Sequence, residues 1–117
     1  MGLFSKMLGG RPGETAINAT LGDAVRVLPG VRSHELRYNH QPHGSGAVSG
    51  VVDVVDSATF LEVLRVVRRV LGTLLGDGAD GVTFYLTGRT PDGHGVAPGD
   101  LGLTQPPTGR EISQRLL

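Results

Sequence analysis

The stretch VSGVVDVVDSATFLEVLRVVRRVLGTLLGDGADGVTFYLT, residues 48–87, decides the fold. Its first part is rich in valine and lacks helical periodicity, which favours a strand inside a sheet. Its last part, VTFYLT, alternates apolar and polar residues, as a strand with one buried face does. The middle part carries an apolar stripe at helical spacing, formed by Phe60, Leu61, Leu64, Val67, Val70, Leu71, Leu74 and Leu75. The stretch therefore predicts strand, helix and strand.

Both ends of the predicted long helix carry suitable capping residues. Asp56 or Ser57 is placed to accept hydrogen bonds from the first helical turn. Gly76 or Gly78 can adopt the left-handed conformation that often ends a helix. We expect the helix to lie across one face of the sheet, because its apolar stripe needs a partner of comparable size.

Two further elements are predicted before this stretch. Residues 14–28 place apolar side chains on one helical face, and Pro29-Gly30 ends that helix. Residues 31–40 read as a strand joined to residues 47–55 through QPHGSG, a hairpin-type connection. The third strand, 82–87, is expected to run parallel to the first strand, beside it or at an edge of its own.

The predicted fold class is α+β. We expect a small antiparallel or mixed three-stranded sheet, of the ferredoxin-like split β-α-β type, covered by one long and one shorter helix. The turn LPGV between a helix and a strand resembles that of small ferredoxin-like modules such as ACT and heavy-metal-associated domains. The resemblance covers about 70 residues, in element order only. The sequence departs from it by showing no strand before Glu14 and no cysteine pair.

The chain divides into two parts by composition. Residues 1–13 are predicted to be a flexible or amphipathic segment, in which Leu3, Phe4, Met7 and Leu8 leave peripheral membrane contact open. Residues 14–117 are predicted to form one domain. Within it, residues 88–109 are rich in glycine and proline, yet Thr90-Pro91-Asp92-Gly93 reads as a β-turn.

The glycine- and proline-rich segment is predicted to be a packed loop. Val96, Leu101 and Leu103 are spaced apolar anchors, which a disordered linker would not need. Thr108 and Glu111 have capping-box spacing at the start of a short C-terminal helix. The same three anchors, Val96, Leu101 and Leu103, are the predicted partner-binding residues.

Composition excludes several classes of function. The chain has no cysteine, so disulfides and thiolate chemistry are excluded, and its net charge is zero. A neutral chain has no general attraction for nucleic acid, so no nucleic-acid partner is expected. All basic residues except Lys6 are arginine, a bias typical of GC-rich bacterial genomes, and no secretory signal is visible. We therefore expect a cytoplasmic bacterial protein without a cofactor.

The candidate ligand-binding residues are His34, Asp53, Tyr38, Tyr85 and His94. If the hairpin pairs residues whose numbers sum to about 87, His34 faces Asp53, a contact that orients an imidazole and raises its pKa. Tyr38 and Tyr85 are candidates for one exposed sheet face. A metal site at His40 and His43 would need further ligands, so none is predicted, and no catalytic residue is assigned.

Three functions remain open from the sequence, and the last of them is an enzyme built on His34 and Asp53. The first is a non-enzymatic module that acts through protein–protein contact or self-association, with a homodimer as one form. The second is a small-ligand-binding, regulatory domain that uses the sheet face near His34 and Asp53. An open sheet of this size leaves edges that another element or a second copy must cover, which favours the first.

Overall fold

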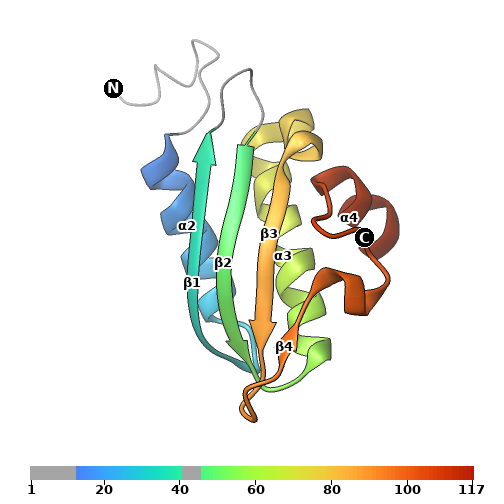
Figure 1. Ribbon diagram of the computed structural model, residues 1–117. Coiled ribbons are helices and arrows are strands. Elements are labelled where there is room, and N and C mark those ends of the chain that lie inside the picture. Colours follow the sequence, from blue (N-terminus) through green and yellow to red (C-terminus); the bar gives the residue numbers. More distant parts are fainter. Residues whose placement is uncertain (1–12, 41–45) are drawn as a thin grey trace.

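The computed structural model describes residues 13–40 and 46–117 (Figure 1). The predicted N-terminal segment with Leu3, Phe4, Met7 and Leu8 therefore lies outside the described residues, apart from Gly13. So does His43 in the hairpin loop. The described elements are α2 (Glu14–Arg26), β1 (Val31–His40), β2 (Gly46–Val54), α3 (Ser57–Leu75), the 3-10 helix η2 (Gly76–Gly81), β3 (Thr83–Arg89), β4 (Gly95–Val96), the 3-10 helix η3 (Pro98–Leu101) and α4 (Gly109–Leu116).

The described chain is α+β, as predicted, but its sheet is larger than predicted. The sheet has four strands in the order β1-β2-β3-β4. The prediction of three strands is wrong because the chain reverses after β3 through the turn at Thr90–Gly93, and Gly95 and Val96 pair with Arg89 and Gly88. Three α-helices are described, and each lies where the sequence predicted a helix.

The placement of the third strand also differs from the prediction. β1 and β2 form an antiparallel hairpin, and β3 lies beside β2 and parallel to it. The expected orientation, parallel to the first strand, is therefore wrong. A strand that follows a helical crossover runs in the same direction as the strand before the helix, and that strand is β2. No strand separates the two parallel strands, so the predicted split arrangement is replaced by direct neighbours.

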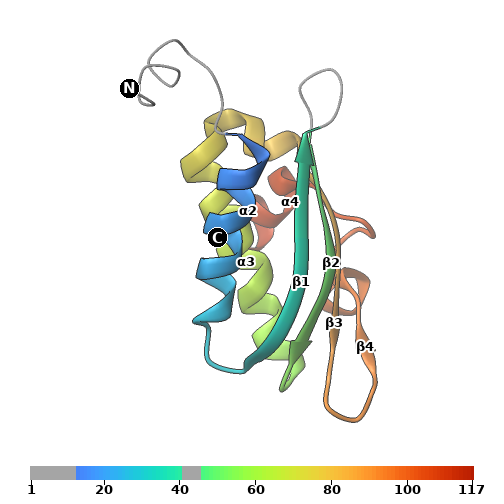
Figure 2. The same cartoon turned by 90° about the vertical axis from the view of Figure 1, so that its left-hand side faces the viewer.

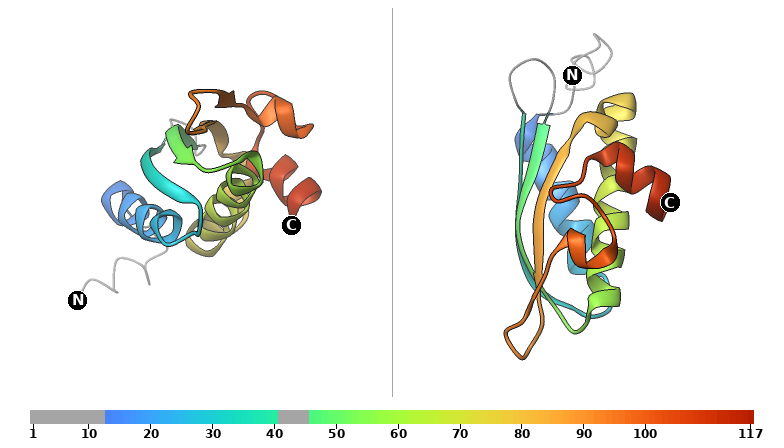
Figure 3. Two further views of the ribbon diagram at one scale, coloured as in Figure 1. Left: turned by 90° about the horizontal axis from the view of Figure 1, so that it is seen from below. Right: turned by 45° about the vertical axis from the view of Figure 1, so that its right-hand side comes forward.

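The helices pack on one face of the sheet and leave the other face open (Figures 2 and 3). Burial alternates along β3, where Phe84 and Leu86 are buried and Tyr85 and Thr87 are exposed. In β2 the buried valines likewise face the helices. The core consists of Ile17, Leu21, Val25, Tyr38, Val48, Val52, Val54, Phe60, Val63, Leu64, Val67, Leu71, Ala79, Val82, Phe84, Leu86, Val96, Leu103 and Ile112.

The predicted N-caps of α3 and α4 are confirmed, and α3 ends at Gly76 as predicted, although the ψ of −133° at Gly76 lies outside the left-handed helical region. The Asp56 side chain accepts from the backbone N–H of Thr59 at 2.9 Å, and Gly76 ends α3 with a positive φ of 59°. The Thr108 side chain accepts from the backbone N–H of Glu111 at the start of α4. Local chemistry therefore sets both ends of α3 and the start of α4. No described helix is long and apolar enough to cross a membrane.

Residues 88–109 are packed against the domain. Val96 and Leu103 are buried, at 5% and 7% exposure, and Leu101 packs partly buried against the core. The segment also closes part of the outer edge of β3, because the Phe84 N–H donates to the Pro107 carbonyl at 2.9 Å. The buried side chains of Val96 and Leu103 are therefore core residues of this chain and are not exposed for a partner.

One glycine fixes the close approach of β1 and β2. Gly50 has a φ of 138°, a conformation that residues with a Cβ rarely adopt. A Cβ at this position would also collide with the backbone carbonyl oxygen of Glu35 on β1. The carbonyl oxygen of Glu35 therefore points toward β2. Glu35 is thus one of the β1 residues whose backbone groups face β2 within the hairpin.

Candidate functional site

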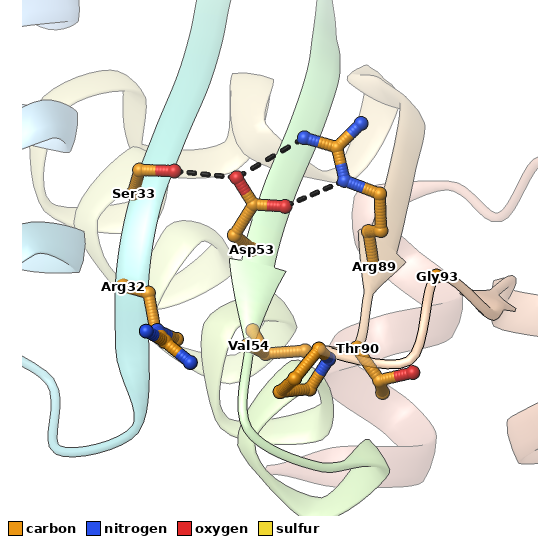
Figure 4. A pocket seen from close by; sticks show the side chains of 8 residues that line it. Arg32, Ser33, Asp53, Val54, Arg89, Thr90 and Gly93 are labelled. Atoms are coloured by element: carbon orange, nitrogen blue, oxygen red, sulfur yellow. Dashed lines mark hydrogen bonds and ion pairs between the residues drawn. The ribbon is translucent and has the colours of Figure 1, made fainter.

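A polar bridge spans three strands on the open face of the sheet. The register places Ser33 of β1, Asp53 of β2 and Arg89 of β3 in one row. The Ser33 hydroxyl donates to Oδ2 of Asp53 at 2.5 Å. Nε and Nη2 of Arg89 donate to the two carboxylate oxygens at 2.7 and 3.2 Å (Figure 4). The bidentate pair holds both side chains in one orientation.

The bridge keeps Asp53 ionised. The Arg89 guanidinium, and then the Ser33 hydroxyl, hold the pKa of the Asp53 carboxyl below its usual value. Hydrogen bonding to Asp53 in turn raises the pKa of Arg89. Both groups are partly exposed, at 29% for Asp53 and 56% for Arg89, so the pair is a fixed feature of the surface. A carboxylate engaged in this way is a poor general base, because its pKa lies far below neutral pH.

A cavity of about 510 Å³ lies beside the bridge, where β2 and β3 end. Its size is within the range of small-molecule sites. Arg32 enters it from β1, and the turn after β3 forms the opposite wall (Figure 4). The Arg32 side chain makes no hydrogen bond or ion pair with another described residue, and its charge is one of the smaller causes of the lowered pKa of Asp53. The lining residues are Arg32, Ser33, Asp53, Val54, Arg89, Thr90, Pro91 and Gly93.

His34 does not face Asp53. The residue numbers of paired positions sum to 86, so Asp53 lies opposite Ser33 and His34 lies opposite Val52. A shift of one residue turns a side chain to the other face of the sheet. His34 therefore packs toward α2, where a Cβ on Gly22 would lie 3.4 Å from its Cε1 atom. Its Nδ1 atom is buried and has no hydrogen-bond partner within the described residues.

The two tyrosines lie on opposite faces. Tyr38 is 1% exposed and belongs to the core, with its hydroxyl 3.0 Å from Nδ1 of His40. Tyr85 is 56% exposed on the open face. The expected shared platform of two tyrosines is therefore not formed, because an even-numbered residue of β1 faces the helices and an odd-numbered residue of β3 faces away.

His94 lies in the connection between β3 and β4 and contacts Asp92. Its Nδ1 atom is 2.7 Å from Oδ2 of Asp92, whose other oxygen accepts from the Thr90 hydroxyl. The Thr90 hydroxyl, followed by His94, lowers the pKa of Asp92 to about 2. The structure thus places His94 in a separate turn cluster. In the described ranges no three possible metal ligands gather.

Sequence reasoning missed Ser33, Arg89 and Arg32. A parallel register between residues 47–53 and 83–89 aligns Asp53 with Arg89, and opposite charges at aligned positions would have been the signal. That signal needs the neighbour of β2 to be known, and the predicted strand order was different. Arg32 carries no signal in the sequence, because its place beside the cavity depends on the irregular register at the start of β1.

The outer edge of β1 is closed along only part of its length. The Tyr38 N–H donates to Oδ1 of Asn18 at 2.7 Å, and Nδ2 of Asn18 donates to the Tyr38 carbonyl at 3.0 Å. The His40 N–H donates to Glu14 at 2.6 Å. Side chains of α2 thus take the place of a neighbouring strand here, where α2 lies beside β1 in Figure 1.

The remaining part of this edge is open. Alternate residues of a strand direct their backbone groups to the same side. The groups of Leu36 and His34 therefore point outward like those of Tyr38. No other backbone or side-chain group in the described part of the chain bonds them. We call residues 34–36 the open segment; Figure 2 looks onto this edge of the sheet.

The chain matches no known protein family, and comparisons with curated proteins and with solved structures found no match either. The surfaces described above are therefore interpreted from their own chemistry.

Proposed function

We propose that this protein is a non-enzymatic interaction module that self-associates by pairing the open segment of β1 with the same segment of a second copy. The observation that carries the proposal is the half-closed edge. Asn18 and Glu14 bond the backbone at Tyr38 and His40, whereas the outward backbone groups of His34 have no partner in the described part of the chain. Unpaired strand edges are templates for strand addition.

A second copy of the chain fits this edge by symmetry. Two identical edge strands that meet antiparallel about a two-fold axis present the same backbone groups to each other. The zero net charge of the chain also keeps repulsion between copies low. The expected product is a continuous sheet through two copies, with the helices of both on one face.

The side chains favour one register. A two-fold axis at His34 places Ser33 opposite Glu35 of the second copy. A two-fold axis at Glu35 instead places two carboxylates opposite each other, which is destabilising. We therefore propose that His34 pairs with His34 of the second copy through backbone hydrogen bonds. The proposed interface moves the partner surface from Val96, Leu101 and Leu103 to β1.

The test compares two substitutions at His34. His34→Pro removes the outward N–H, whereas His34→Ala removes the same side chain and keeps the N–H. Sedimentation velocity over a range of concentrations is expected to show dimers for the native chain and for His34→Ala, and monomers for His34→Pro. A native chain that stays monomeric at every concentration, or a His34→Pro variant that dimerises as well as His34→Ala, would refute the proposal.

Amide hydrogen exchange gives a second readout in the unmodified chain. The N–H groups of His34 and Leu36 are expected to become more protected as concentration rises. The N–H of Tyr38 serves as the internal control, because Asn18 already bonds it in one copy. Equal concentration dependence at all three amides, or none at any, would contradict pairing through the open segment.

A further inference from the structure

We infer that the cavity beside Asp53 binds a small monocarboxylate, with the Arg32 guanidinium as the group that recognises the carboxylate. This site uses side chains, whereas the proposed self-association uses backbone groups of residues 34–36. The two surfaces meet at Ser33, which lines the cavity and lies opposite Glu35 of the second copy in the proposed pairing. It rests on three observations: an unpartnered arginine, a neutralised pair beside it and an apolar surface below it.

The first observation is the charge of Arg32. Its guanidinium points from β1 toward the cavity, on the side of Val54 (Figure 4), and has no ion-pair partner within the described residues. A guanidinium presents parallel N–H donors that match the two oxygens of a carboxylate. Arg32 is therefore a recognition group that the protein itself leaves unused.

The second observation is that the other charges on the cavity wall are already engaged. Asp53 is held by Arg89 and Ser33, so the carboxylate and the guanidinium of that pair offset each other. The lining then keeps one positive charge, that of Arg32. Arg89 is a positioning residue here, because its two hydrogen bonds hold the Asp53 carboxylate, which makes no direct ion pair with Arg32.

The charge around the cavity selects a monoanion. A neighbouring cavity of about 410 Å³ shares Thr90 and Pro91 with this one and is lined by Asp56 and Asp92. Both carboxylates are ionised at neutral pH, because hydrogen bonds from Thr59 and from Thr90, respectively, lower their pKa values. A phosphate dianion would meet these charges with only one unpaired arginine to bind it, so a carboxylate is favoured.

The third observation concerns the rest of the ligand. Pro91 is exposed and contributes apolar surface to the cavity, and the Thr90 and Ser33 side chains border it. Val54 also lines the cavity, but its side chain is fully buried in the core. A short aliphatic chain attached to the carboxylate would remove that apolar surface from water. The ligand class is therefore a short-chain aliphatic carboxylic acid, which the protein binds without changing it chemically.

The experiment is an NMR titration of the native chain with butyrate, in parallel with butanol and with inorganic phosphate. Butyrate is expected to give saturable shifts at the amides of Val54, Thr90 and Gly93. Butanol tests the apolar surface alone, and phosphate tests the charge alone. Both are expected to bind at least tenfold more weakly than butyrate.

Two matched variants locate the recognition group. Arg32→Gln is expected to weaken butyrate binding at least tenfold. Arg37→Gln removes an exposed arginine of the same strand that does not line the cavity, and it is expected to leave binding within twofold of the native value. Amide spectra of both variants check that the fold is retained.

Several results would overturn the inference. Absence of saturable shifts with butyrate excludes the site. Phosphate binding that equals or exceeds butyrate binding excludes the monocarboxylate. Equal effects of Arg32→Gln and Arg37→Gln assign any binding to general surface charge. The concentration dependence of sedimentation is read separately, so a failure here leaves the self-association test unaffected.

Discussion

Replacing Asn18 by alanine tests the idea that its side chain closes the edge of β1 at Tyr38. Asn18 is half-buried on α2 and makes two hydrogen bonds to the backbone of Tyr38, at 2.7 and 3.0 Å. Each such bond contributes about 1 kcal/mol to the free energy of unfolding. Alanine returns about 0.6 kcal/mol through its higher helix propensity. The expected net loss is therefore about 1.4 kcal/mol.

Thr20→Ala is the matched control on the same helix. Thr20 is exposed and its hydroxyl bonds only to the Ala16 carbonyl one turn earlier, a contact within α2. Its replacement has about the same gain in helix propensity and loses only this exposed bond within α2, so the free energy of unfolding should rise by about 0.6 kcal/mol or less. Urea denaturation followed by far-UV circular dichroism measures both variants at a concentration low enough to limit association.

Two outcomes would refute this reasoning. If Asn18→Ala and Thr20→Ala lose the same stability, the contacts to Tyr38 contribute nothing net. If Asn18→Ala is less associated than the native chain at high concentration, the edge does not control self-association. The reasoning requires the opposite, because the substitution adds the backbone groups of Tyr38 to the unpaired edge.

Three further predictions follow from individual contacts. Gly50→Ala should lower the free energy of unfolding by more than about 3 kcal/mol, because it meets both a positive φ and the Glu35 carbonyl. Gly93 also has a positive φ, of 89°, but open space around it, so Gly93→Ala measures the cost of the backbone conformation alone and should lower the free energy of unfolding by about 1–2 kcal/mol. Equal losses for the two variants in urea denaturation would contradict a clash with Glu35 at position 50. Thr90→Val should raise the pKa of Asp92 from about 2, as read by NMR titration of its carboxyl carbon. Because folding lowers this pKa, the stability that Asp92 contributes is complete above the pKa of the unfolded chain and is lost as the pH falls toward 2. An unchanged pKa in the variant would exclude the Thr90 hydroxyl as the main cause of the shift. Arg68→Met should lower the free energy of unfolding by about 2 kcal/mol, because the Arg68 side chain, 12% exposed, donates to the Gly109 carbonyl of α4 at 2.9 Å and to Asp80 of η2 at 2.7 Å. Thermal unfolding unchanged from the native chain would show that these contacts do not hold α4 in place.

The arrangement of charges explains why the site is specific to this fold. Asp53, Arg89 and Ser33 are separated by 20 residues or more along the chain, yet they form one hydrogen-bonded row. The residues next to each of them in the sequence give no sign of this contact. The row exists because β2 and β3 are parallel neighbours in a register that aligns Asp53 with Arg89.

The sequence by itself determined the local structure. The apolar stripe from Phe60 to Leu75 and the Asp56 cap specify α3, since helical periodicity and capping act within one or two turns. The alternation in residues 82–87 specifies the buried face of β3, and the α+β class follows from the order of such elements. The anchors at Val96 and Leu103 likewise identified the packed segment.

Only the tertiary structure decided which strands are neighbours and in which register. A difference of one in the pairing sum replaced His34 by Ser33 as the partner of Asp53. Hydrophobic alternation repeats every two residues, so it assigns faces without identifying the neighbouring strand. The side-chain bonds of Asn18 and the isolation of Arg32 likewise depend on where α2 and the turn after β3 pack against the sheet. Contacts between distant segments decided both surfaces on which the proposed functions rest.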